Sequence, residues 1–564
     1  MKFKTAVKKR LNLMIFRDLY FLYAYHKNLV QQVQILRDYL KLKNNSKFLR
    51  YKGDCSLNRK VLVVSLTSDF PYQIKLEAIL AKALQLAGCS VQVLTWKHSF
   101  WSKKYFRLFG INKFMNFEEY FHDNGADKPE ESLSGFLSKK INFREVKNWR
   151  YKGCRIGQQV LSALARKDYS TPDLSDSKSR ELFDRYLMRQ ISAVDAAEWL
   201  LDKEKPDILL FCEANGLIYG AVFDFAFKRG LNIVQFARAL REDSLIFKKF
   251  NPESFGLHPN SISKSTFEEI KKIPWSEKYE RILWEEFSLR YGKKEHASHR
   301  DKGGEVNNEA ERIIKQLGLD KNKKTAVIFP HVLWDANLYY GEDIFTDYEE
   351  WFIETVKAAC NNPKVNWIIK LHPANIWKRR REKIKSELRE VTLIKEKVGN
   401  LPPHVYLLYP EAKISTFSLF KIADYGITVR GTVGMEMPCF GDVVFTAGTG
   451  RYSGLGFTND SASKEDYLDK LSRIQDFLPL TEEQVLLAKK HAYAVFVLRP
   501  WRKRSFEANL DYNLKGIHPL DHKFNILVNS SNELSAAEDL NKFSNWVLNS
   551  NSPDYLERIK DENP

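Results

Sequence analysis

The sequence has few cysteines, and glycine and proline are not enriched in it. The cysteines lie far apart, with no CxxC pair and no histidine at zinc-site spacing, which excludes a disulfide framework and predicts reduced, buried thiols. The six are Cys55, Cys89, Cys154, Cys212, Cys360 and Cys439. The 26 glycines and 19 prolines among 564 residues are no enrichment, which argues against collagenous and low-complexity chains.

Long hydrophobic runs are also missing. The longest run near the start is interrupted by Arg17 and Asp18, so neither a spanning helix of about 20 residues nor a signal-peptide core fits. We therefore expect a cytoplasmic protein. A chain of 564 residues is too long for one core, and at roughly 100–200 residues per domain it predicts two large domains with additional elements.

Acidic residues are in the minority, and the formal net charge is +18. Nucleic acid, acidic lipid and nucleotide-sugar phosphates are the anionic partners that such an excess suggests. Nucleic acid has only the charge in its favour, because no recognisable binding module accompanies it. Residues 1–57 are strongly basic with interleaved aromatics, which favours an amphipathic helical segment. It would either contact the anionic inner membrane or pack against its own domain.

Two series of alternating strands and helices follow. In the first, apolar runs at 61–66, 91–95, 206–212 and 232–236 read as strands, and residues 100–200 read as a helical insertion. The second has strands at 324–330, 365–371, 405–409, 425–429 and 442–446. We predict an α/β fold with two Rossmann-like, doubly wound parallel-sheet domains at 58–292 and 309–475, joined by a linker at 293–308. Residues 476–564 read as a C-terminal helical segment with a polar tail.

Polar residues gather where the strands of the second series end. They are His331, Asp335, Lys370, His372, Arg430, Gly431 and Thr432. Parallel strands place their carboxyl ends on one edge of a sheet, where ligands bind in open α/β folds. These residues are therefore the candidate ligand-binding set. In the first series Glu213, Asp69 and His98 hold corresponding positions.

A short helix is expected to begin after Thr432, which would act as its N-cap and present free N–H groups to a phosphate. Glu436, one turn on, would reach ribose hydroxyls, and Pro438 predicts a kink or early end. The glycine-rich segment 448–456 is neither a GxGxxG nor a Walker motif, and its Tyr452 is a further candidate for contact with the donor nucleotide. The segment either closes over a ligand or serves as a flexible crossover.

Several of these runs occur together in a recognisable order. They are Phe329-Pro-His-Val-Leu-Trp-Asp335, Lys370-Leu-His-Pro373, Ile414-Ser-Thr416, Thr428-Val-Arg-Gly-Thr-Val-Gly-Met-Glu436 and Gly450-Arg-Tyr-Ser-Gly-Leu-Gly-Phe457. Over roughly residues 320–475 the chain resembles bacterial capsule polysaccharide biosynthesis proteins, GT-B glycosyltransferases related to capsular Kdo transferases. The resemblance implies two domains facing a cleft, with the donor nucleotide on the second and the glycan or lipid-linked glycan acceptor on the first.

The resemblance also implies residue roles. His372 would contact the donor phosphate, Thr432 its oxygens, and Glu436 the ribose or base of a CMP-linked sugar such as CMP-Kdo. The Kdo enzymes tend to have a Ser-Gln or Thr-Gln pair before this helix, whereas this chain has Arg430-Gly-Thr432. A UDP- or GDP-sugar therefore stays open.

A DxD metal motif at a strand end is absent from the sequence, and GT-B enzymes usually work without a metal. No cofactor or metal is expected, and Lys370, His372 and Arg430 would stabilise the leaving phosphate. Glu213 is the first candidate for the base or nucleophile and Asp69 the second, while His98 would touch the acceptor. The alternatives are a CDP-polyol phosphotransferase of the teichoic-acid type and a non-catalytic glycan-binding or scaffold protein of the polysaccharide machinery.

Overall fold

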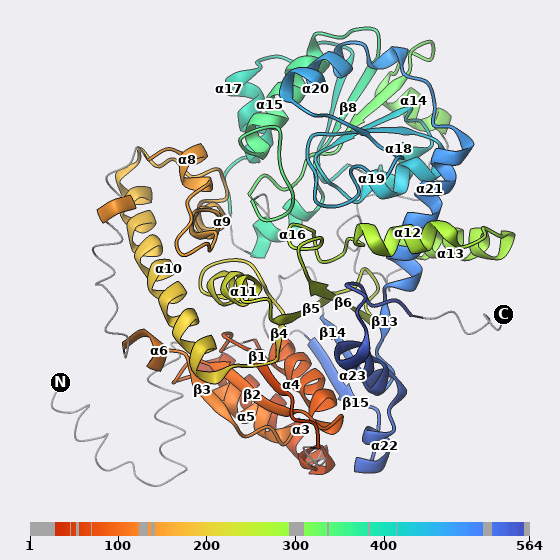
Figure 1. The fold of residues 1–564 in the computed structure, drawn as a ribbon. Coiled ribbons are helices and arrows are strands. Elements are labelled where there is room, and N and C mark those ends of the chain that lie inside the picture. The colour runs from red at the N-terminus through yellow and green to blue at the C-terminus, as the bar shows by residue number, and fades with distance from the viewer. Residues whose placement is uncertain are drawn as a thin grey trace. The chain divides into compact units, whose positions relative to one another are not determined.

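The computed structural model describes residues 29–45, 47–51, 56–68, 70–122, 134–136, 141–292, 310–334, 338–381, 384–412, 414–510 and 522–557 (Figure 1). The chain forms two compact units. Unit 1 comprises Met1–Glu119, Lys503–Asn513 and Ile517–Asn549, and unit 2 comprises Tyr120–Arg502, Leu514–Gly516 and Ser550–Pro564. Most of the predicted basic segment 1–57 and all of the predicted linker 293–308 lie outside the described residues.

Unit 1 begins with the predicted strand–helix–strand pattern. Its strands β1 (Lys60–Val64), β2 (Ser90–Thr95) and β3 (Phe114–Asn116) pair in parallel in that order. Its helices here are α3 (Leu29–Asn45), α4 (Pro71–Leu86) and α5 (Phe100–Leu108), followed by α6 (Glu119–His122) at the start of unit 2. A salt bridge of 2.9 Å between the buried Lys75 Nζ and the half-buried Asp38 joins α4 to α3.

The rest of unit 1 corrects the prediction that residues 476–564 form a helical segment with a polar tail. Strands β14 (Phe506–Leu510) and β15 (His522–Ile526) form an antiparallel hairpin, and α22 (Ser531–Ser535) and α23 (Glu538–Asn549) follow. Phe506, Ala508 and Leu510 are buried, while the two residues between them are half-buried. This period of two is the pattern of a strand with one buried face, and it was present in the sequence.

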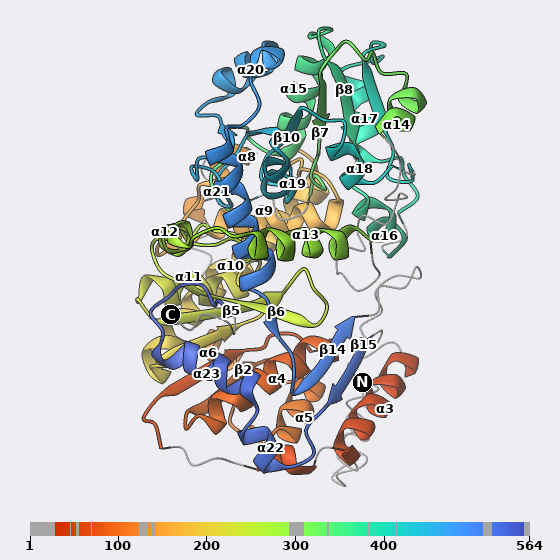
Figure 2. The same ribbon diagram turned by 90° about the vertical axis from the view of Figure 1, so that its right-hand side faces the viewer.

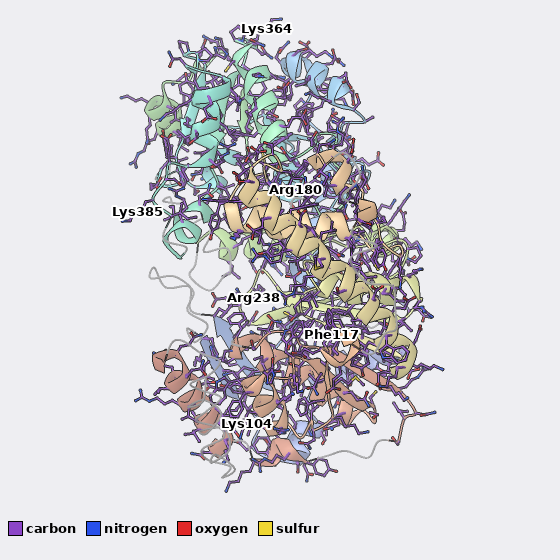
Figure 3. The ribbon with its side chains drawn as sticks, turned by 90° about the vertical axis from the view of Figure 1, so that its left-hand side faces the viewer. Lys104, Phe117, Arg180, Arg238, Lys364 and Lys385 are labelled. Carbon is purple, nitrogen blue, oxygen red and sulfur yellow. The ribbon has the colours of Figure 1, made fainter. Side chains whose placement is uncertain are left out.

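The first part of unit 2 contains β4 (Ile208–Phe211) and β5 (Asn232–Arg238), which pair in parallel as predicted. Two antiparallel strands then extend this group, because β6 (Ser244–Phe250) pairs with β5 and β13 (Trp501–Arg502) pairs with β6. The helices are α8 (Phe143–Lys147), α9 (Ile156–Asp168), α10 (Ser177–Glu204) and α11 (Tyr219–Lys228). Figure 3 shows Arg180 near the start of the long helix α10.

The second sheet of unit 2 confirms the predicted parallel, doubly wound pattern. Its order is β9-β8-β7-β10-β11-β12, and every neighbouring pair is parallel. The strands are β7 (Thr325–Ile328), β8 (Asn366–Lys370), β9 (Val405–Leu408), β10 (Tyr425–Thr428), β11 (Val443–Thr446) and β12 (Asn459–Asp460). Ala326 and Ile328 enter one hydrophobic core and Val327 enters another, so both faces of the sheet are covered.

Helices surround this sheet, with α15, α17 and α20 grouped beside β8 in Figure 1. They are α14 (Ala310–Leu317), α15 (Tyr348–Cys360), α16 (Ala374–Arg381), α17 (Arg389–Lys397), α18 (Thr416–Phe420), α19 (Val433–Glu436) and α20 (Lys464–Ser472). A third core lies where α21 (Glu482–Tyr493) contacts α12 (Lys264–Lys272) and α13 (Glu277–Gly292), as Figure 2 shows. Among the described helices, none has the length and apolar character that crossing a membrane requires.

The predicted polar tail is partly a buried element of unit 2. Asp554 is 1% exposed, and its Oδ1 lies 2.5 Å from Lys248 Nζ and 3.5 Å from Arg499 Nη2. Its Oδ2 accepts hydrogen bonds from the Ser263 backbone N–H (2.6 Å) and the Thr266 hydroxyl (2.8 Å). Burial alone would raise the pKa of Asp554, but the two cations outweigh it and lower that pKa to about 2.

Replacing Asp554 with Asn should lower the free energy of unfolding by about 3–5 kcal/mol, because two buried cations lose their counter-charge. An unfolded aspartate titrates near pH 3.9, so the carboxylate's stabilisation is complete above that value and is lost as the pH falls toward 2. Denaturant unfolding at pH 7 and at stepwise lower pH measures the free energy of unfolding of the wild type and of Asp554→Asn. The difference between the two values should decrease as the pH falls. The control is Asp469→Asn, which removes an exposed partner of Arg473 and should change stability by at most about 1 kcal/mol.

Candidate functional site

The carboxyl ends of β7 and β10 are joined through His331. Its Nε2 accepts a hydrogen bond from the backbone N–H of Arg430 (3.2 Å), and its ring stacks on Tyr348 at 4.6 Å between centroids. Thr428 Oγ1, on β10, lies 3.4 Å from the same nitrogen. The predicted gathering of strand-end residues is thus found here, because two of the predicted segments are in direct contact.

The end of β8, the neighbour of β7, supplies Lys370 and His372. Lys370 is buried, whereas His372 is half-buried and precedes α16. His372 Nδ1 accepts a hydrogen bond from the backbone N–H of Ala374 (3.1 Å). Pro373 has no N–H, so the amide two residues on is the first that can reach the ring. This bond fixes the ring orientation and leaves Nε2 as the donor of the neutral imidazole.

Arg430 is satisfied inside the protein. Its guanidinium forms an ion pair with Asp343 and donates to the carbonyl oxygen of Tyr340. Both side chains of the pair are about nineteen-twentieths buried, at 5% and 6% exposure. Burial raises the pKa of Asp343, and Arg430 and Lys147 only partly offset this effect. Sequence reasoning assigned the charge of Arg430 to a leaving phosphate, but an aspartate already neutralises that charge.

Thr432 does not act as an N-cap. Its backbone is already helical, with φ −60° and ψ −26°, and its side chain makes no capping hydrogen bond. A cap residue needs an extended backbone that turns its hydroxyl toward the N–H groups of the first turn. The predicted interruption at Pro438 is confirmed, because α19 has four residues and a 3-10 turn, Met437–Phe440, replaces its continuation.

Glu436 is also engaged within unit 2. It is 1% exposed, its Oε1 lies 2.6 Å from Arg290 Nη2, and its other oxygen accepts from the Tyr291 hydroxyl. Both partners belong to α13. The carboxylate that the sequence assigned to a ribose or base therefore holds α19 against α13.

Tyr452 lies beneath the Arg430–Thr432 segment. Its hydroxyl donates to the carbonyl oxygen of Gly431 (2.7 Å), and the side chain is buried. A Cβ atom at Gly434 would collide with this ring. Tyr452 thus supports the segment that carries Gly431 and Thr432.

Three loops cross at what we call the glycine junction: Gly256, Gly341 and Gly450. The N–H of Gly341 donates to the carbonyl oxygen of Gly256 (2.8 Å), and the carbonyl oxygen of Gly450 accepts from the N–H of His258 (3.0 Å). Gly341 and Gly450 have φ values of +70° and +89°, and a Cβ atom on Gly341 would collide with the backbone of Thr449. The junction fixes the loop after β6 against the loops after β7 and β11.

This crossing brings residues of the first series to the site. Asn215 Nδ2 donates to the Tyr340 hydroxyl (2.9 Å), and Glu213 Oε1 accepts from the Asn215 backbone N–H (3.1 Å). Glu213 is half-buried. The predicted strand-end loop of the first series therefore contacts the second series, as a two-part site requires.

His258 is a residue of this region that sequence reasoning missed. Its ring lies 4.7 Å from that of Tyr340, and its Nδ1 accepts from the backbone N–H of Asn260 (3.0 Å). Burial lowers its pKa well below 6.5, and Arg451 and Arg430 add to the effect, so the ring is neutral at pH 7. A signal was present, because Leu257-His-Pro259 repeats the tripeptide Leu371-His-Pro373 with the same local hydrogen bond.

A cleft of about 540 Å³ lies between α16, α17 with the residues before it, and the segment Tyr409–Glu411 that follows β9. Its lining includes Asn375, Arg379, Lys385, Glu387, Tyr409 and Glu411. Figure 3 labels Lys385, one of the residues before α17. The cleft has the position that ligands take in open α/β sheets, beyond the carboxyl ends of the strands.

Three of the predicted residues remain. Asp69 and Asp335 lie outside the described residues, and His98 is exposed in unit 1 after β2. Within the described ranges, no group of three or more histidine, cysteine, aspartate or glutamate side chains could hold a metal ion.

Comparison with solved structures finds enzymes that handle activated sugars. The chain is similar to a Thermosulfurimonas dismutans KpsC β-Kdo 2,4-transferase, at 15% identity and a TM-score of 0.34, over 59% of this chain and 88% of that one. It is similar to UDP-GlcNAc 2-epimerase from Neisseria meningitidis, at 11% identity and a TM-score of 0.25, over 78% of this chain and 96% of that one. It is also similar to the glycosyltransferase VinC in complex with dTDP, at 12% identity and a TM-score of 0.23, over 78% of this chain and 96% of that one. No protein-family model and no curated protein sequence matches the chain.

Replacing Gly341 with Ala should disrupt the glycine junction. The left-handed backbone costs about 1–2 kcal/mol for a residue with a Cβ, and overpacking adds about 1–3 kcal/mol. Gly454→Ala is the matched control, because Gly454 also has a positive φ (+78°) but no heavy atom within 4 Å of a built Cβ. Unfolding measurements should show the larger loss for Gly341→Ala, and equal losses would mean that the close crossing is not formed.

Proposed function

We propose that this chain is a glycosyltransferase that moves a sugar from a nucleotide-sugar donor to a growing capsule or other surface polysaccharide. A CMP-linked donor such as CMP-Kdo is favoured by the motifs at 329–335, 370–373 and 428–436. The observation that carries the proposal is the contact of the β7 and β10 ends beside β8, together with the cleft. A parallel sheet binds nucleotides at this edge.

On the donor side, the nucleoside would occupy the cleft and its phosphate would face His372. The oriented ring would donate a hydrogen bond from Nε2 to a phosphate oxygen, which gains negative charge as the bond to the sugar breaks. The backbone N–H of Thr432, on the segment that Tyr452 supports, would donate to the same oxygens, whereas the N–H of Gly431 already donates to Thr428 Oγ1 (3.1 Å). No cofactor is assigned, because the nucleotide sugar is itself a substrate.

On the acceptor side, Glu213 would act as the base. A hydroxyl of the glycan, free or lipid-linked, would attack the anomeric carbon, the carbon–oxygen bond to the donor phosphate would break, and Glu213 would take the hydroxyl proton. The Asn215 N–H holds one oxygen of this carboxylate in place. Asp69 is the second candidate. This reaction belongs in the cytoplasm, at the inner face of the membrane where a lipid-linked acceptor would be available.

A nucleotide panel tests the donor site. CMP, CDP, UDP and GDP are added separately to the wild type and to His372→Ala, and thermal unfolding is followed, because a ligand that binds only the folded state raises the melting temperature. We expect one nucleotide to stabilise the wild type and to lose its effect in the variant. His404→Ala is the control, since His404 precedes β9 and so lies at the amino-terminal ends of the strands, away from the carboxyl ends that carry the candidate site.

Absence of a shift with every nucleotide would overturn the assignment and favour the glycan-binding or scaffold alternative. If CDP stabilises the protein and the isolated product gains phosphorus, the polyol phosphotransferase replaces the glycosyltransferase.

Glu213→Gln should slow nucleotide release from the donor by about 10²–10⁴-fold, because the amide cannot accept a proton. The nucleotide-induced shift in melting temperature should stay, since Glu213 does not line the cleft. Glu269→Gln, at an exposed position on α12, should release nucleotide at the wild-type rate. Full activity of Glu213→Gln would exclude this residue as the base and leave Asp69.

A further inference from the structure

The region around α19 contains an arginine that has no carboxylate partner among the described residues. Three guanidinium groups lie there, on Arg290, Arg430 and Arg451, and two of them have a carboxylate partner. Arg290 pairs with Glu436, and Arg430 pairs with Asp343. In the part of the chain that the structure describes, no carboxylate oxygen lies within 4.0 Å of the Arg451 guanidinium.

Arg451 is held against the candidate donor site. It follows Gly450 of the glycine junction, and its Nη1 donates to the backbone carbonyl oxygen of Arg430 (3.2 Å). Its Nε is buried and has no hydrogen-bond partner among the described residues. A backbone carbonyl oxygen satisfies one N–H but brings no negative charge, so the guanidinium remains unneutralised.

The surroundings of Arg451 are unfavourable for an isolated charge. The residue as a whole is half-buried, with its Nε in the buried part. Burial lowers the pKa of Arg451 and Arg290 adds to this effect, whereas Tyr452 and Glu436 partly offset it. His491, buried nearby, is neutral because burial and Arg451 lower its pKa to about 3. A charge that is partly removed from water and has no ion-pair partner costs free energy, and a ligand that supplies the missing negative charge reduces that cost.

We infer that Arg451 binds the phosphate of the donor, in the role that sequence reasoning gave to Arg430. The phosphate supplies the missing negative charge, and the guanidinium offers it paired N–H donors. His258, with Nδ1 occupied, is a neutral donor near Arg451 through Nε2 and adds no further charge. The identity of the ligand rests on the proposed function, whereas the anion site itself does not.

Inorganic pyrophosphate tests the site without a base or a sugar. Thermal unfolding of the full chain is followed at low ionic strength with increasing pyrophosphate, for the wild type and for Arg451→Gln, Arg451→Lys and Arg473→Gln. Arg473, exposed and paired with Asp469, is the matched control for loss of one positive charge in the same part of the chain. Wild type and Arg473→Gln should be stabilised at similar concentrations.

Arg451→Gln should weaken the apparent affinity for pyrophosphate by at least about tenfold, and Arg451→Lys by less, because lysine keeps the charge but not the paired donors. Without pyrophosphate, Arg451→Gln should melt at or above the wild-type temperature, since it removes an uncompensated charge. If Arg451 served only to stabilise the fold, Arg451→Gln without pyrophosphate would melt below the wild-type temperature. That result would count against the proposal.

Two results overturn the inference. One is a wild type that pyrophosphate does not stabilise, and the other is an Arg451→Gln variant that pyrophosphate stabilises as well as the wild type. If pyrophosphate stabilises Arg451→Gln as well as the wild type, but a nucleotide raises the melting temperature of the wild type and not of His372→Ala, the proposed function stands and only the role of Arg451 fails. If pyrophosphate binding needs Arg451 but no nucleotide binds, the anion site stands and the proposed function fails.

Discussion

The glycine junction is the constraint on which the rest of the candidate site depends. Three backbones approach too closely for a Cβ atom on Gly341, and the positive φ there aims the loop that carries Tyr340. Tyr340 in turn accepts from Asn215, lies against His258, and presents its carbonyl oxygen to Arg430. Tyr340 is thus one of the points at which the first and second series of unit 2 meet, beside the Gly341–Gly256 hydrogen bond and the Arg290–Glu436 ion pair.

The sequence predicted the framework well, because buried parallel strands are short β-branched and apolar runs that can be read locally. The strand-end residues His331 and His372 followed from that framework. The actual partners of Arg430 and Glu436 did not, since Asp343 is 87 residues from Arg430 and Tyr291 is 145 residues from Glu436. Pairing over such distances is decided by tertiary packing, and no spacing in the sequence records it. The β14–β15 hairpin is different, because its alternating pattern was present and was overlooked.

The two Leu-His-Pro tripeptides separate local from tertiary effects. In both, proline removes one N–H and the histidine Nδ1 accepts the amide two residues on. Local sequence therefore determines the ring orientation at both places. The ionisation of His258 is set by burial and by Arg451 and Arg430, which come from distant loops. The same motif thus provides an oriented ring wherever it occurs, while its charge depends on the fold around it.

The buried position of Asp554 has a consequence for the order in which the protein matures. A ribosome releases Lys248 and Arg499 long before it adds Asp554, and the intervening residues 503–549 belong largely to the other unit. Until Asp554 is added, the two cations have no shared anion. The core of unit 2 therefore cannot be completed before most of the sequence of unit 1 has also been synthesised. The packing of Asp554 into unit 2 is therefore a late step of folding, and a nascent chain stalled before it would present an unfinished core to chaperones and proteases.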